Sequence, residues 1–229
     1  PVVFDSVLST QIKSTFSAQF TQVAQFVRVG NVSGVKSGVD SMISYLNSVT
    51  SFLQKIDNGM EGDETVAERI LGFEVGMGMA KEKSNAYRMY LKASLSENES
   101  RLTEEVKATL ERFSDLTKLS KFDATVVYKE VVGPFLKETV LSSTEDIHSL
   151  TGGAEIDEVV QNLGLNSDAV KEIKEEVYVQ RLEEIVSSAE GGIFSEEQSA
   201  GLKNLMEFLT IEEGTAAKLH TRLNGPAFK

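Results

Sequence analysis

The chain has 229 residues, of which 41% are hydrophobic and 25% are charged, the composition of one large or two small globular domains. It contains no cysteine, which excludes disulfides, thiolate zinc sites and thiol redox chemistry within it, and only 3 prolines, which favours long helices over a loop-rich β fold. The net charge of −12 disfavours nucleic acid and anionic lipid as partners and favours basic ones.

The charge is unevenly distributed. Residues 1–56 hold four basic side chains against two acidic ones and total +2, so the remaining residues total −14. Since no run of about 18 apolar residues occurs, no ordinary membrane-spanning helix is expected. The chain begins with Pro1, without Met and without a signal segment, and we expect it to be a piece of a longer protein.

Two amphipathic helices are predicted at the start of the chain, over residues 4–29 and 35–56, separated by a break at 30–34. Their apolar residues recur at steps of three and four: Phe4, Leu8, Ile12, Phe16, Phe20, Val23 and Val27, then Val35, Val39, Met42, Leu46, Val49, Leu53 and Ile56. The two helices form a predicted helical hairpin. The polar face of the first is Ser, Thr and Gln, and the sequence leaves open whether water, a partner helix or a membrane surface meets it.

Residues 57–68 resemble a calcium-binding loop. Asp57, Glu61, Gly62 and Glu68 take the places of ligands 1 and 5, the central glycine and the bidentate acid. Position 3 is Gly59, which offers no side-chain oxygen, so the sequence favours a solvated turn. Calcium binding remains an alternative.

A third helix is predicted from about residue 63 to 78, and it contains three glycines, Gly72, Gly76 and Gly78. Each weakens a helix by up to about 1 kcal/mol, so they indicate either close approach of another helix, which we favour, or a break. A further helix holds Tyr87, Tyr90 and other apolar residues and ends in the polar run 96–100. This run divides the predicted N-terminal hairpins, 1–98, from the helical repeats predicted over 99–229.

The repeats have a period of about 46 residues, which is typical of arrays of helical hairpins. Six columns stay apolar or small in three successive copies: Leu110/Ile156/Leu202, Phe113/Val159/Leu205, Leu119/Leu165/Ile211, Ala124/Val170/Ala216, Val127/Ile173/Leu219 and Val131/Val177/Leu223. The sequence therefore predicts an all-α, elongated, HEAT-like α-solenoid of helical hairpins, continuous with the N-terminal part.

Three helix starts and one helix end are predicted within the repeats. Ser195-x-x-Gln198 and Thr210-x-x-Glu213 have the pattern of capping boxes, and Ser120-x-x-Asp123 holds the equivalent place one copy earlier. At Gly133-Pro134 the proline removes a backbone donor, so we expect the helix to stop or kink there and a short helix to follow through Leu136.

No catalytic motif is recognisable. His148 and His220 lie far apart in sequence and outside any metal-binding or triad pattern, and no phosphate-binding loop or nucleophile elbow occurs. We therefore predict a protein that is not an enzyme, with no catalytic, cofactor-binding or metal-binding residues and no nucleic-acid partner. The residues that bind a peptide are not identifiable from the sequence.

From residue 163 onward the chain resembles a known family. Leu163-Gly164-Leu165, the segment Val177-Tyr178-Val179-Gln180-Arg181-Leu182, and Glu190-Gly191-Gly192 before Ser195 are similar to the repeat of the large scaffold subunit of the Tic complex, the translocon at the inner envelope membrane of chloroplasts. Tyr87-Arg88-Met89-Tyr90-Leu91 resembles a tyrosine-rich segment of the same family. The resemblance covers residues 87–229, and the first 80 residues match in character only.

The resemblance implies the C-terminal stromal part of a membrane-anchored plastid protein. The family is expected to receive transit peptides of imported precursors and to gather stromal chaperones and a co-chaperone-like translocon subunit. Transit peptides are basic, rich in serine and poor in acids, so the acidic chain suits them. The lack of cysteine argues against any thiol-based regulation here. A generic acidic protein–protein adaptor, a calcium-responsive helical protein and an unrecognised enzyme remain the alternatives.

Overall fold

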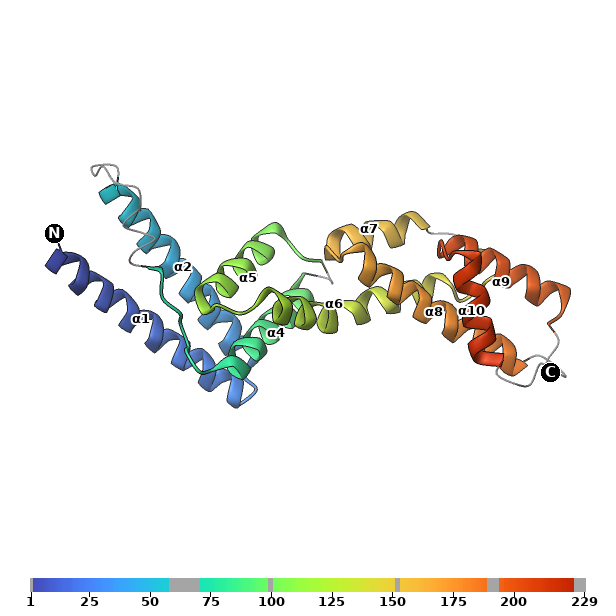
Figure 1. The fold of residues 1–229 in the computed structure, drawn as a ribbon, viewed down its shortest axis with the longest axis horizontal. Coiled ribbons are helices and arrows are strands. Elements are labelled where there is room, and N and C mark those ends of the chain that lie inside the picture. The colour runs from blue at the N-terminus through green and yellow to red at the C-terminus, as the bar shows by residue number, and fades with distance from the viewer. Residues whose placement is uncertain (1, 58–70, 99–100, 151–152, 189–193, 225–229) are drawn as a thin grey trace. The chain divides into compact units, whose positions relative to one another are not determined.

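A computed structural model gives the structure of residues 2–57, 71–98, 101–150, 153–188 and 194–224, and in these residues the regular secondary structure is entirely helical (Figure 1). The predicted all-α class is therefore confirmed. The helices are α1 (Val2–Arg28), α2 (Val32–Asp57), α4 (Ala80–Glu97), α5 (Glu104–Thr117), α6 (Lys121–Ser143), α7 (Gly153–Leu163), α8 (Ser167–Ser188), α9 (Glu196–Phe208) and α10 (Glu213–Asn224).

The chain divides into two compact units, residues 1–131 and 132–229, and the division falls within α6. This division separates two parts of the chain that have many contacts within themselves and few with each other. It does not test where the helical repeats begin. The boundary at residue 98 and the continuity of the solenoid stay predictions.

In the first unit, α1 and α2 pack against each other as the predicted hairpin, and α4 packs against both. The apolar faces named from the sequence are the buried ones: Phe16, Val23, Val35, Val39, Met42 and Leu53 are each completely enclosed. The Asn31 side chain accepts a hydrogen bond from the backbone N–H of Gly34 at 2.9 Å and so fixes the start of α2. Local sequence thus defines this hairpin.

An aromatic cluster joins segments of the first unit that are distant in sequence. The ring of Phe16 lies 4.9 Å from that of Tyr45 in α2 and 5.9 Å from that of Phe73. The ring of Phe20 lies 6.4 Å from that of Phe113 in α5. Because aromatic rings bury large areas, this cluster is the centre of the first unit's core.

The prediction of a helix through residue 78 is wrong in its second half. Residues 72–79 form a loop, and Gly76 and Gly78 there have φ values of +69° and +78°, which helices do not contain. A β-carbon on Gly76 would lie 2.3 Å from the ring of Phe20, so the backbone approaches α1 as closely as a glycine allows. The expected close approach exists, but it requires a loop. The part of the predicted helix at residues 63–70 lies outside the described residues.

The helix that follows this loop agrees with its prediction. α4 buries Tyr87, Tyr90, Leu91 and Leu95 along one face. It ends at Glu97, inside the polar run that was expected to end it. The backbone N–H of Asn98 bonds the carbonyl of Ser94 at 3.2 Å and closes the last turn.

The three successive helix pairs, α5/α6, α7/α8 and α9/α10, share one type of turn. Lys118, Gly164 and Thr210 each have positive φ, at +54°, +61° and +58°, and each follows the preceding one by 46 residues. In the first and third turns the next residue, Leu119 or Ile211, donates its N–H to the carbonyl five residues back. This left-handed ending is the standard way to stop one helix and redirect the chain.

Burial along the pairs follows the six predicted apolar columns. Each column member whose side chain the structure describes is buried or half-buried, and Leu110, Ile156 and Leu202 are all buried. The side chain of Leu223 lies outside the described residues. These columns therefore supply the core of each pair, while the arrangement of the pairs as a HEAT-like solenoid stays a prediction.

Two of the three predicted helix caps are confirmed. Ser195 and Gln198 form the full capping box at the start of α9. The Ser120 hydroxyl accepts from the backbone N–H of Asp123 at 3.0 Å at the start of α6. Thr210 is not a cap, because it occupies the left-handed turn and its hydroxyl bonds the Leu209 carbonyl. The chain needs that residue to end α9, so α10 begins only at Glu213.

The expectation that Pro134 would stop a helix is also wrong. α6 runs from Lys121 to Ser143 with Pro134 inside it, and no separate short helix follows. The proline removes one backbone donor and disfavours the preceding turn, but Val132, Leu136 and Val140 are completely buried on either side. Tertiary burial of these residues outweighs the local cost.

The left-handed turns give a testable prediction about stability. Replacing Thr210 with Gly should raise the free energy of unfolding by about 1 kcal/mol, because a β-branched residue is strained at positive φ and glycine is not. Gly164→Ala should lower it by a similar amount. Gly214→Ala in α10, where a β-carbon has open space, is the control and should be neutral or stabilising in the same urea titration. Equal effects at Gly164 and Gly214 would contradict the role of the turn.

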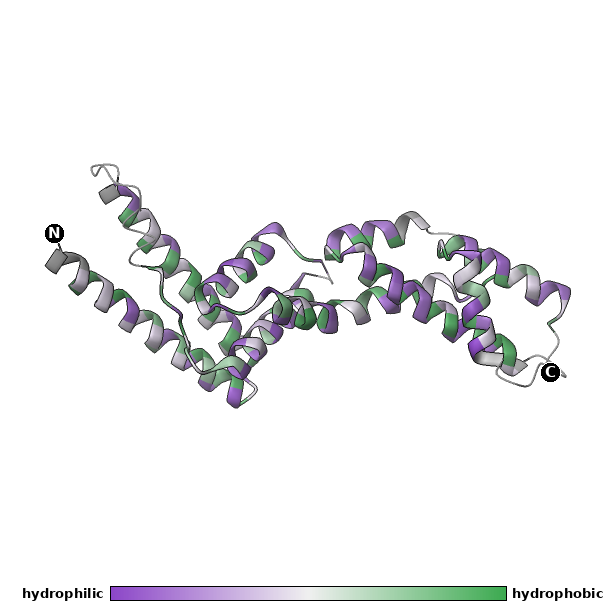
Figure 2. Cartoon of the chain, viewed as in Figure 1, coloured by the Kyte–Doolittle hydropathy of each residue, from purple (hydrophilic) through white to green (hydrophobic). Residues whose placement is uncertain are grey.

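Apolar and polar residues alternate along the helices, which is visible as alternating colour in Figure 2. Within the described ranges, no helix combines the length and the hydropathy needed to cross a bilayer.

Candidate functional site

The two histidines have separate local partners. Asp146 accepts one hydrogen bond from the backbone N–H of His148 and one from the hydroxyl of Ser149, each at 3.0 Å. These two bonds stabilise a surface turn. His220 in α10 lies with its Nε2 2.7 Å from the hydroxyl of Tyr178 in α8. Each histidine therefore has a structural contact of its own.

The described residues contain no group of three His, Asp or Glu side chains that could hold a metal ion. Residues 58–68 of the predicted calcium-like loop lie outside the described residues. The calcium alternative is therefore untested.

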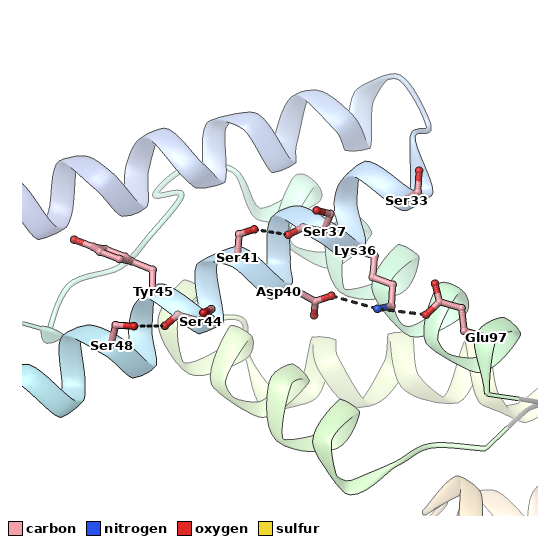
Figure 3. A pocket seen from close by; sticks show the side chains of 9 residues that line it. All are labelled: Ser33, Lys36, Ser37, Asp40, Ser41, Ser44, Tyr45, Ser48 and Glu97. Carbon is pink, nitrogen blue, oxygen red and sulfur yellow. Dashed lines mark hydrogen bonds and ion pairs between the residues drawn. The ribbon is translucent and has the colours of Figure 1, made fainter.

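A groove of about 780 Å³ runs along α2 in the first unit (Figure 3). Its lining is serine at helical spacing, with charged residues at its centre: Ser33, Lys36, Ser37, Asp40, Ser41, Ser44, Tyr45, Ser48 and Glu97. Ser41 and Ser48 donate their hydroxyl protons to carbonyls of the preceding turn, at 2.8 and 3.0 Å. These two hydroxyls are therefore bonded to the backbone of α2 itself. We call this groove the serine groove.

The charges in the serine groove form one network, in which a single lysine pairs with two carboxylates. The Lys36 ammonium lies 3.2 Å from Asp40 and 3.3 Å from Glu97, and Tyr90 donates its hydroxyl proton to Asp40 at 2.7 Å. Burial lowers the pKa of Lys36, but the bonds to the two carboxylates outweigh it and the pKa is raised overall. Burial, together with the Asp40 charge, raises the pKa of Tyr90. This network joins α2 to α4 and leaves no reactive group.

A second groove, of about 630 Å³, lies in the second unit between α6, α8 and α10. Four glutamates of one α8 face line it against two cations, with apolar side chains between: Lys137, Glu172, Glu175, Glu176, Val179, Gln180, Glu183, Leu219 and Arg222. Lys137 pairs with Glu176 at 3.0 Å. We call it the acidic groove.

The acidic groove lies in the strongly charged half of the chain. Residues 132–229 hold 18 Asp and Glu against 8 Lys and Arg, a net charge of −10, while residues 1–131 hold 17 against 15, a net charge of −2. Several like charges in one groove produce a stronger electrostatic potential than an isolated charge does, and this potential attracts ligands of the opposite charge. A basic ligand is therefore the one that this groove suits.

Sequence reasoning did not identify the acidic groove, although a signal for it exists. Glu175 and Glu176 follow Glu172 by three and four residues, and Glu183 follows Glu176 by seven. The four glutamates must therefore share one helix face. The spacing does not identify the residues of the opposite wall, because Lys137 and Arg222 belong to other helices, α6 and α10.

A smaller, aromatic pocket of about 330 Å³ lies between α8, α9 and α10. The rings of Tyr178 and His220 stack at 5.9 Å, and Phe194 meets His220 edge-on at 6.4 Å. Lys203 and Glu213 are the charged residues in its lining. Burial lowers the pKa of His220 below its ordinary value of 6.5. The neutral imidazole is thus favoured in the folded chain.

This shift predicts a pH dependence of stability. Below about pH 6.5 the unfolded chain binds a proton at His220 more readily than the folded chain does, so the free energy of unfolding should fall as pH is lowered through this range. His220→Gln keeps a side chain that can bond the Tyr178 hydroxyl but cannot titrate, and it should flatten the slope between pH 7.5 and 5.5. Urea denaturation at each pH measures the slope, with His148→Gln as the control. An unchanged slope in His220→Gln would contradict the prediction.

The described residues thus form an all-helical protein whose distinguishing features are polar and charged grooves. Residues 3–229 match the Tic110 family, whose description is chloroplast envelope transporter. Because the match covers almost the whole chain, the chain belongs to this family of chloroplast envelope import components, and the resemblance noted from residues 87–229 is confirmed. The family acts in chloroplast protein import and is not a known enzyme family. No curated protein and no solved structure matches the chain.

Proposed function

We propose that this chain is a non-enzymatic scaffold on the stromal side of the inner envelope membrane, and that its acidic groove binds the transit peptides of imported precursors. The observation that supports this most strongly is the groove itself, in a unit of net charge −10. Transit peptides are rich in arginine and serine and poor in acids, so their charge complements that of the groove. Family membership supplies the setting of protein import.

The chemistry of binding follows from the groove lining. Among the described residues, Glu175 and Glu183 have no ion-pair partner, so each is available to an arginine or lysine of the peptide. Val179 and Leu219 lie half-buried between them and offer apolar contact to the stems of these side chains. Surface pairs of this kind contribute about 0.2–1 kcal/mol each, so binding should be weak and sensitive to salt.

The scaffold part of the proposal concerns the helix pairs. The left-handed turns at 118, 164 and 210 and the buried columns support a HEAT-like α-solenoid, in which repeated pairs present extended surfaces to partners. Stromal chaperones and a co-chaperone-like translocon subunit are the further partners that we propose. The serine groove, whose charged residues are already paired with one another, is available to them.

The proposal is tested by binding of a fluorescent transit peptide to the chain across a salt series, beside a scrambled peptide of the same composition. Tighter binding of the true peptide, weakening as salt rises, is the expected result. Equal binding of both peptides would instead favour a generic acidic adaptor. Absence of binding at low salt would remove peptide recognition from this part of the protein.

Variants locate the site. Glu175→Gln with Glu183→Gln should weaken transit-peptide binding by about 2- to 30-fold, the loss of two exposed ion pairs. Glu105→Gln with Glu111→Gln on α5 is the matched control, because it removes the same charge from exposed positions outside the groove. Fluorescence anisotropy of the labelled peptide measures both. Equal weakening by the two double variants would show that only overall charge matters.

A further inference from the structure

Two large apolar side chains are exposed next to each other near the start of α6. Phe122 is 77% exposed and Val126 is 40% exposed. They are four residues apart, so they lie on the same helix face. Val127 and Val131, on the opposite side of the helix, are buried at 4% and 2% exposure and hold α6 in the fold. The exposed pair therefore takes no part in that packing.

The helical repeat provides an internal comparison for this pair. The equivalent residues of the next copies, 46 and 92 residues later, are Asp168 and Glu172 in α8 and Gly214 and Lys218 in α10, and all four are exposed. The helix pair thus folds with small or charged residues at these places. Since the fold does not require Phe122 and Val126, their exposure indicates a binding surface.

Basic residues flank the apolar pair on one side of the helix, while exposed Asp123 and Glu130 lie on the other side. Lys118 and Lys121 are exposed just before the pair, and Lys129 follows Val126 by three residues on the same face. The corresponding residues of the second copy are Gly164, Ser167 and Glu175. Equivalent faces of α6 and α8 therefore have opposite charge. We call the face made by Lys118, Lys121, Phe122, Val126 and Lys129 the basic–apolar patch.

We propose that the basic–apolar patch of one chain binds the acidic groove of a second copy. The groove has the complementary chemistry: Glu175 and Glu183 face the lysines, and half-buried Val179 and Leu219 form an apolar floor. Its volume of about 630 Å³ exceeds what one phenylalanine ring needs. Exposed Lys118 and Lys121 favour an acidic occupant, and the acidic groove is a surface of this chemistry in the described part of the chain.

The contact joins two different surfaces, so a pair of chains held by one contact keeps one free groove on one chain and one free patch on the other. Association of this kind can add further copies as concentration rises. Because the attraction is between exposed charges around a small apolar contact, it should be strongest at low ionic strength. The proposal does not depend on transit peptides, although a peptide in the same groove would compete with it.

Sedimentation of the full 229-residue chain at 5–500 µM tests the proposal. At 20 mM salt the average mass should rise with concentration, and at 500 mM salt the chain should be monomeric. F122D combined with V126E, which installs the residues of the second copy, should abolish association with unchanged helicity by circular dichroism. F122D/V126E leaves the acidic groove intact, so transit-peptide binding should persist in this variant. Self-association and transit-peptide binding are therefore tested independently of each other. A chain that stays monomeric throughout, or an association that survives F122D/V126E, would overturn the proposal.

Charge exchange provides the second test and identifies the partners. K118E/K121E and E175K/E183K should each lose self-association. An equimolar mixture of the two should associate, because the unchanged patch of E175K/E183K can bind the unchanged groove of K118E/K121E and the two altered surfaces are again of opposite charge. The mixture should bind at least tenfold more tightly than either variant binds itself. No association in the mixture, with both variants folded, would overturn the pairing. Binding of the wild-type patch to vesicles with 30% anionic lipid, lost in F122D/V126E, would point to a membrane surface as occupant in its place.

Discussion

Replacing Leu205 with Ala is expected to lower the free energy of unfolding of the second unit by about 2–5 kcal/mol. Leu205 lies in α9 with none of its surface exposed, and α9 packs on α8. Removing the side chain loses its transfer free energy and leaves a cavity that the surrounding helices fill only in part. Urea denaturation followed by circular dichroism measures the change.

Leu165→Ala is the comparison for this result. Leu165 follows the left-handed turn at Gly164 and is only half-buried, so its loss should cost about 1 kcal/mol, near the lower end for a partly buried side chain. Hydrogen exchange of the α9 amides should show the same order of effects. If the two substitutions had equal effects, Leu205 would not be a core residue in solution.

Replacing Gly76 with Ala is expected to lower the free energy of unfolding of the first unit by about 2–5 kcal/mol. Two costs combine, since positive φ strains any residue with a β-carbon by about 1–2 kcal/mol and overpacking costs about 1–3 kcal/mol more. The new β-carbon would lie 2.3 Å from the Phe20 ring, a separation at which the ring or the loop must move. Phe20 is 1% exposed and has little room to move.

Gly78→Ala separates the two costs. Gly78 also has positive φ, at +78°, but a β-carbon there meets no atom within 4 Å. Its replacement should therefore cost only the backbone strain, about 1–2 kcal/mol. Urea denaturation of both variants measures the difference, which should be at least 1 kcal/mol. Equal costs would show that the loop does not press on Phe20 in solution.

Much of the fold could be predicted because the helices of this chain are defined locally. The spacing of Phe16, Phe20 and Val23 on one face identifies α1, and burial confirms it. The Ser195–Gln198 capping box gives the start of α9 because both of its bonds lie within four residues. Family membership was also detectable, since it is encoded in local helix-packing motifs.

Two of the errors, at Gly76 and Pro134, share a physical cause, which is that distant contacts overruled a local preference, whereas the third, at Thr210, arises from a local left-handed turn. Gly76 lies in a loop because the ring of Phe20, more than 50 residues away, requires a backbone without a β-carbon. Pro134 stays inside α6 because buried neighbours on both sides hold the helix together. Thr210 has the sequence of a cap, but the chain must turn there.

The helical class, the N-terminal hairpin and the apolar columns could be read from local sequence, because a helix depends on residues three and four positions apart. The grooves could not be found in this way, since their walls come from separate helices. Lys36 meets Glu97 from α4, and the α8 glutamates meet Lys137 and Arg222 from α6 and α10. Only tertiary packing decided which side chains face one another, because that depends on contacts between residues that the chain order keeps apart.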